Sequence, residues 1–148
     1  MNIPKQCNKE ITFMLYNYNN IDKIIEDRKE EIMDNMSVTN TAYLKSIKSK
    51  NSNTLEDVVM KFDSDKYIKR LKKWKQLINS FCSKLYDNES KLYYYFIKYK
   101  YFLKRNDYFI MEHMNLDNKK LNKINTYLKW LLYEYAVIEE LFVRKEAN

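Results

Sequence analysis

Glycine is absent from this 148-residue sequence, and Pro4 is its only proline. Strand-rich folds need glycine in their tight turns, and phosphate-binding loops need it where the backbone approaches the ligand closely. The composition therefore excludes nucleotide-binding loops of the glycine-rich kinds and predicts an all-α protein. At this length we expect one domain, or a small domain with an appended helical arm.

Cysteine and histidine are also scarce: Cys7, Cys82 and His113 are the only ones. Two distant cysteines make no disulfide framework, so we expect the reduced thiols of a cytosolic protein. A metal site would need further ligands close to His113, and no side chain has the pattern of an activated nucleophile. We therefore expect no enzyme activity, no metal and no cofactor.

Long apolar runs are missing as well. None approaches the roughly 18 residues that a membrane span requires, and the segment Met1–Glu10 is too polar for a signal peptide. The sequence thus predicts a soluble, cytoplasmic protein that does not bind membranes.

The chain has many charged residues and a formal net charge of +7, and these charges are distributed unevenly along the sequence. Acidic residues exceed basic ones between Asn8 and Met36, whereas basic residues exceed acidic ones between Lys91 and Leu132. A basic protein favours a polyanionic partner, most simply nucleic acid. We therefore expect a nucleic-acid site in the C-terminal half.

Apolar spacings of three and four residues predict five or six helices. An acidic helical arm and a polar linker are expected over residues 1–53, with Asn17, Asn19 and Asn20 as an interruption and Ser37–Thr54 as the linker. A helical DNA-binding domain follows over residues 54–148. It begins with a long central helix that has a basic outer face and a potential break at Asp63–Asp65.

A helix-turn-helix pattern lies at residues 107–132. Ile110 and Met114 share one face of a short helix, and Asn115 stands where the backbone often adopts a positive φ. Asp117 can cap a second helix. The buried stripe of that helix is expected to consist of Leu121, Ile124, Leu128 and Leu131.

The opposite face of this second helix is rich in amides and lysines and has no acid after Asp117. Such a face suits the major groove, where asparagine pairs with adenine and lysine contacts guanine or phosphate. We predict base contacts from Asn118, Lys119, Asn122, Lys123 and Thr126. We predict DNA backbone contacts from Lys72, Lys73, Lys98, Lys100, Lys104, Arg105, Lys120 and Lys129.

With these elements placed, the chain resembles the phage late-gene transcription regulators of the RinA and ArpU type, whose C-terminal half is similar to the region-4 helix-turn-helix of sigma factors. The likeness lies in KLYDNES (Lys84–Ser90), LYYYFIKYKYF (Leu92–Phe102) and the unit from Asp107 to Leu132. Within these segments, Leu85–Glu89, Ile110–Met114 and Leu131–Leu132 match the family pattern. The acidic segment Asn17–Ile32 is also similar to a helix that opens several such proteins.

The resemblance implies a transcription activator of phage or prophage genes that acts near a promoter in the cytoplasm of a bacterial host. It gives Asn118, Lys119, Asn122 and Lys123 the contacts to bases and phosphates. It leaves open whether RNA polymerase is contacted directly. We further expect a homodimer or higher oligomer, because the amphipathic helices at Leu71–Leu85 and Tyr135–Phe142 carry apolar surface that must be covered.

Two other kinds of helical protein fit the same pattern. One is a protein-interaction module that uses a tyrosine-rich surface, since tyrosine is favoured at interfaces; in the simplest packing, Tyr95 and Tyr99 would be core while Tyr94 and Tyr101 stay partly exposed. The other is a DNA-packaging protein like a small terminase, which binds DNA as a ring. The candidate surface is formed by Tyr93, Tyr94, Tyr95, Tyr99 and Tyr101.

Overall fold

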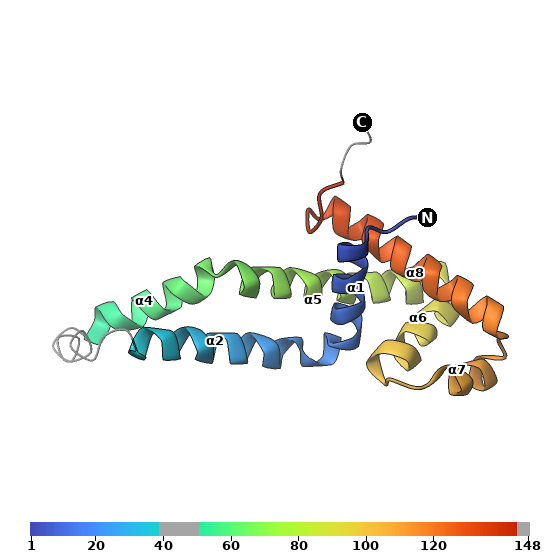
Figure 1. Ribbon diagram of the computed structural model, residues 1–148, viewed down its shortest axis with the longest axis horizontal. Helices are drawn as coiled ribbons and strands as arrows, with labels where there is room; N and C mark the ends of the chain where they lie inside the picture. Colours follow the sequence, from blue (N-terminus) through green and yellow to red (C-terminus); the bar gives the residue numbers. More distant parts are fainter. Residues whose placement is uncertain (39–50, 145–148) are drawn as a thin grey trace. The chain divides into compact units, whose positions relative to one another are not determined.

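The computed structural model describes residues 1–38 and 51–144, and within these ranges the protein is all-helical, with no strand. The helical pattern is interrupted at both expected places, near Asn17–Asn20 and near Asp63–Asp65. The described ranges therefore contain seven α-helices instead of the expected five or six. The helices (Figure 1) are α1 (Lys5–Tyr16), α2 (Ile21–Val38), α4 (Asn51–Ser64), α5 (Lys66–Lys84), α6 (Lys91–Ile97), α7 (Asp107–Met114) and α8 (Asn118–Ile138).

Helix α1 ends at Tyr16 and is followed by Asn17, at the first of the predicted interruptions. The backbone N–H of Asn17 donates to the Phe13 carbonyl at 3.0 Å, and its side-chain amide donates to the same oxygen at 2.8 Å. A short 3-10 turn, Tyr18–Asn20, then leads into α2. Asparagine side chains compete well for backbone groups, which explains why the helix stops here.

The chain divides into two compact units, one made of Met1–Asn19 with Lys73–Asn148 and the other of Asn20–Lys72. This division differs from the expected boundary after residue 53, because α1 packs against α8 and so joins the C-terminal part of the chain. The expected linker is also shorter at both ends, since α2 extends to Val38 and α4 begins at Asn51. The rest of that linker lies outside the described residues.

In the unit Asn20–Lys72, α2 lies beside α4 (Figure 1). Asp65 stands at the second interruption, between α4 and α5, and accepts a hydrogen bond from the Ile68 N–H at 3.0 Å. The Arg28 guanidinium donates to both oxygens of this carboxylate, at 3.0 and 3.2 Å, and these bonds lower the pKa of Asp65. Asp65 therefore caps α5 and ties its start to α2.

In the other unit, the core forms where α1, α5, α6 and α8 meet. Leu15 on α1, Phe81 on α5, Phe96 on α6 and Leu132 on α8 are all buried. The indole N–H of Trp74 donates to Glu10 Oε2 at 2.7 Å, which links α5 to α1. In Figure 1, α1 lies beside α8, in agreement with the contacts between them.

Two π-helical turns flank α6 and change which of its residues are buried. In each turn a backbone N–H donates to the carbonyl five residues earlier: Ser90 to Leu85 at 2.9 Å and Leu103 to Lys98 at 2.8 Å. Each extra residue rotates the following residues by about 100° relative to a regular helix. Regular α-helical spacing therefore predicts the wrong buried residues in this part of the chain.

The tyrosines show this correction directly. Tyr101 is buried, at 1% exposure, because it lies five residues after the core residue Phe96 in the wider turn. Tyr95 is exposed at 36%. The expectation that Tyr95 is core while Tyr101 stays partly exposed is therefore wrong.

Candidate nucleic-acid interface

A three-residue turn joins α7 to α8. Asn115 has φ 54° and ψ 53°, the left-handed conformation expected at this position. The N–H of Leu116 donates to the Met111 carbonyl at 2.9 Å, which closes the end of α7 in the manner of a Schellman motif. Asparagine adopts this conformation more readily than other residues with a Cβ, so this sharp turn forms without glycine.

Asparagine and aspartate cap the two helices. Asn106 Oδ1 accepts a hydrogen bond from the Phe109 N–H at 2.8 Å at the start of α7, and Asp117 Oδ1 accepts one from the Lys120 N–H at 2.7 Å at the start of α8. The predicted cap at Asp117 is confirmed. Ile110 and Leu121 are buried, and α7 contacts α8, so packing as well as the turn holds the two helices together.

We expect the turn to be sensitive to its residue at position 115. Asn115→Gly should raise the free energy of unfolding by up to about 1 kcal/mol, whereas Asn115→Ala should lower it by about 1–2 kcal/mol, because only glycine adopts positive φ without steric cost. Urea denaturation followed by circular dichroism measures both changes. Equal stability of the two variants would contradict the left-handed turn.

The first half of α8 exposes the amide- and lysine-rich face. Asn118, Lys119, Asn122, Lys123 and Thr126 are all exposed. All of them except Asn118 line an open groove of about 600 Å³, together with Met1, Tyr93, Ile124 and Tyr127. The structure thus brings most of the predicted base-contacting residues to one concave surface.

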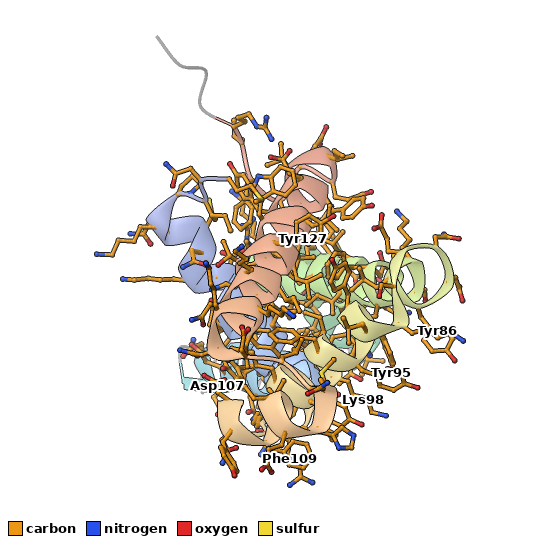
Figure 2. The ribbon with its side chains drawn as sticks, turned by 90° about the vertical axis from the view of Figure 1, so that its right-hand side faces the viewer. Tyr86, Tyr95, Lys98, Asp107, Phe109 and Tyr127 are labelled. Carbon is orange, nitrogen blue, oxygen red and sulfur yellow. The ribbon has the colours of Figure 1, made fainter. Side chains whose placement is uncertain are left out.

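Two tyrosines of this groove were not predicted as part of a DNA-binding surface. Tyr93 on α6 and Tyr127 on α8 have ring centroids 5.7 Å apart, and Tyr127 is visible on α8 in Figure 2. Helical spacing alone indicates Tyr127, since it lies four residues after Lys123 and shares its face. Tyr93 belongs to another helix, and its place in the groove depends on tertiary packing.

Lys129 continues the lysine face but is half-buried against a second basic residue. Burial, and then the charge of Lys100, lower the pKa of Lys129. Lys100 itself is 15% exposed, and its ammonium lies 3.0 Å from Asp107 Oδ1. The neighbouring Asn125 accepts a hydrogen bond from the Tyr101 hydroxyl. These contacts fix α8 against the π-helical turn Lys98–Phe102.

The other predicted backbone contacts are dispersed. Lys104 and Lys120 are exposed, Arg105 lies over the Phe109 ring at 5.1 Å, and Lys98 lies over the Tyr95 ring at 5.9 Å. Lys73 donates to the Glu139 carbonyl at 2.8 Å, so it supports the end of α8. Lys72 is exposed and belongs to the unit Asn20–Lys72.

Within residues 1–38 and 51–144, the structure contains no group of three or more His, Cys, Asp or Glu side chains arranged to hold a metal ion. In the same ranges no helix combines the length and apolar character needed to cross a membrane. The candidate site is thus a surface of cations, amides and aromatic rings on a helical protein.

Residues 8–134 match the model of the DUF722 family, described as proteins of unknown function. The match covers most of the chain, which therefore belongs to this family. No curated protein and no solved structure matches the sequence.

Proposed function

We propose that the protein is a sequence-specific regulator that binds duplex DNA, with α7 and α8 as a helix-turn-helix and α8 as its recognition helix. The observation that carries this proposal is the exposed face of Asn118, Lys119, Asn122, Lys123 and Thr126. Residues 118–133 contain no acid, and recognition helices read DNA mainly with residues near their N-terminus.

Some residues of this face contact bases and others contact phosphates. Asn118 and Asn122 pair with adenine edges, while Lys119 and Lys123 contact guanine or phosphate, and Thr126 contacts a base edge. Lys120, Lys104 and Arg105 are exposed and contact the DNA backbone. Because Lys73, Lys100 and Lys129 have structural partners or are partly buried, they contribute less.

The likeness to regulators of the RinA and ArpU type supports a narrower proposal: activation of phage or prophage genes at a promoter. It is carried by the segments Lys84–Ser90, Leu92–Phe102 and Asp107–Leu132. Contact with RNA polymerase would follow from that role.

The structure weakens the argument for an oligomer that rests on apolar surface. Phe81 on α5 and Leu85, the first residue of the π-helical turn after α5, are buried within one chain. Phe142 packs against Trp74 and Tyr133 at ring distances of 5.6 and 5.8 Å. Part of the apolar surface that suggested a dimer is thus covered within one chain, while Ile138 on α8 is 71% exposed. A dimer stays a prediction, and it rests on the observation that many helix-turn-helix proteins bind paired half-sites as dimers.

The proposal predicts salt-dependent binding to duplex DNA through the lysines of α8. Changing Lys119, Lys120 and Lys123 together to glutamine should reduce the slope of log affinity against log salt by up to about 3, because each phosphate contact releases nearly one counterion. Fluorescence anisotropy with a labelled duplex at several salt concentrations measures this slope.

The matched control changes Lys23, Lys61 and Lys69 to glutamine, which removes the same charge from exposed positions in the other unit. This control should keep most of the parental slope. Equal slopes for the two triple variants would show that net charge, and not α8, binds the duplex.

A further inference from the structure

Six aromatic rings form a continuous row on one side of the molecule. We call it the aromatic row, and it runs from the π-helical turn Leu85–Glu89 across α6 to α7. Successive ring centroids along it are 5.3, 5.3, 6.2, 5.8 and 5.3 Å apart. Its members are Tyr86, Tyr94, Tyr95, Tyr99, Phe109 and His113.

Burial in the core does not account for the aromatic row. None of its six rings is buried, and Tyr86 and Tyr95 are exposed at 40% and 36%. The aromatic residues Trp74, Phe81 and Phe96, in contrast, are almost fully buried. Figure 2 shows Tyr86, Tyr95 and Lys98 on the same side of the molecule, with Phe109 beyond them on α7.

Three cations accompany the row along its length. Lys91 lies 4.9 Å from the centre of the Tyr86 ring, Lys98 lies 5.9 Å from Tyr95, and Arg105 lies 5.1 Å from Phe109. Such distances are typical of cation–π contacts. The row therefore alternates flat rings with positive charge.

The rings also border an open groove of about 550 Å³. Tyr86, Tyr94, Tyr95 and Lys98 form one side of it, and the stacked pair Tyr18 and Phe102, 4.8 Å apart, lies at another. Asp87 is the only acid among its lining residues, and no residue of this groove belongs to the α8 groove.

We propose that the aromatic row binds single-stranded DNA. Proteins that bind single strands without sequence preference combine aromatic rings, on which bases stack, with a positive groove that follows the phosphates. A base that stacks on Tyr86 or Tyr95 displaces the lysine ammonium from the ring toward the adjacent phosphate. Duplex DNA keeps its base faces inside the helix, so this site is chemically distinct from the α8 surface and does not depend on the function proposed above.

The test is binding of a fluorescein-labelled oligo-dT of about 12 nucleotides, a length within the usual site sizes. In the full chain, Tyr86→Ala with Tyr95→Ala should weaken binding by about 5- to 150-fold for each ring that stacks a base. Tyr86→Phe with Tyr95→Phe keeps both rings and should bind as tightly as the parent. Tyr67→Ala, at an exposed tyrosine of the other unit, is the matched control.

Each outcome decides the proposal. It is supported if the double alanine variant, folded by circular dichroism, loses oligo-dT and binds duplex DNA to the same extent as the parent, whatever that extent is. It is overturned if the parent does not bind oligo-dT at low salt, or if the alanine variant binds it unchanged, and a protein partner would then account for the row. It is also overturned if duplex binding falls equally. Asn122→Ala should leave oligo-dT binding unchanged, and a parent that binds oligo-dT but no duplex DNA would overturn only the α8 proposal.

Discussion

Trp74→Ala should lower the free energy of unfolding by about 3–5 kcal/mol, the usual cost of removing a large buried aromatic side chain. Trp74 is fully buried, its ring packs against Phe142 at 5.6 Å, and its indole N–H donates to Glu10. One side chain thus joins α5 to α1 and to the segment after α8. Urea denaturation followed by circular dichroism measures the change.

Two variants separate the sources of this loss. Trp74→Phe keeps most of the apolar contact but removes the hydrogen bond to Glu10, so it should cost only about 1–3 kcal/mol. Trp130→Ala removes the same side chain at a half-buried position of α8 and should cost less than Trp74→Ala. If Trp74→Ala were no less stable than Trp130→Ala, the packing described for this unit would be incorrect.

Asn122→Ala should weaken binding to a specific duplex site by about 1–3 kcal/mol, the usual value of a good bidentate contact with adenine. Binding to unrelated duplexes should change little, because a base contact adds nothing where the wrong base is present. Asn122 is exposed in the groove of α8, so the protein should remain folded. Anisotropy titrations with the specific site and a scrambled duplex measure the difference.

Asn88→Ala is the matched control, because Asn88 is an exposed asparagine in the π-helical turn Leu85–Glu89. It should not affect either duplex. Lys123→Ala adds a further distinction: it should weaken both duplexes if Lys123 contacts phosphate, and only the specific site if it contacts guanine. Unchanged affinity of Asn122→Ala for the specific site would remove this residue from base recognition.

The turn between α7 and α8 could be predicted from the sequence because its determinants are local. Asn115 adopts positive φ and Asp117 accepts a hydrogen bond from a backbone N–H three residues later. Both properties follow from the residue itself and its immediate neighbours. The exposure of Asn122 and Lys123 followed in the same way from regular helical spacing.

The buried face of α6 could not be predicted in this way. The π-helical turns Leu85–Glu89 and Lys98–Phe102 each insert a residue, and the sequence gives no local signal for either. Tyr101 consequently reaches the core and Tyr95 the surface. Prediction from spacing assumes 3.6 residues per turn throughout, and it fails where that assumption does.

The roles of the lysines could not be predicted from the sequence, because they depend on partners that are distant in the sequence. Lys73 donates to the Glu139 carbonyl, and burial together with the nearby charge of Lys100 lowers the pKa of Lys129. A basic residue on an amphipathic helix is indistinguishable from a DNA contact until such packing is known. Tertiary structure therefore gives more of the lysines predicted to contact the DNA backbone a structural partner than it does the residues predicted to contact bases.

The central claim, that α8 reads duplex DNA, is tested most directly by selecting bound fragments from random duplex DNA at two salt concentrations. Our account predicts that one common sequence is enriched, that it persists at the higher salt while unrelated fragments are lost, and that Asn122→Ala fails to enrich it. Enrichment of no sequence at either concentration, or of the same sequence by the parent and Asn122→Ala alike, would contradict it.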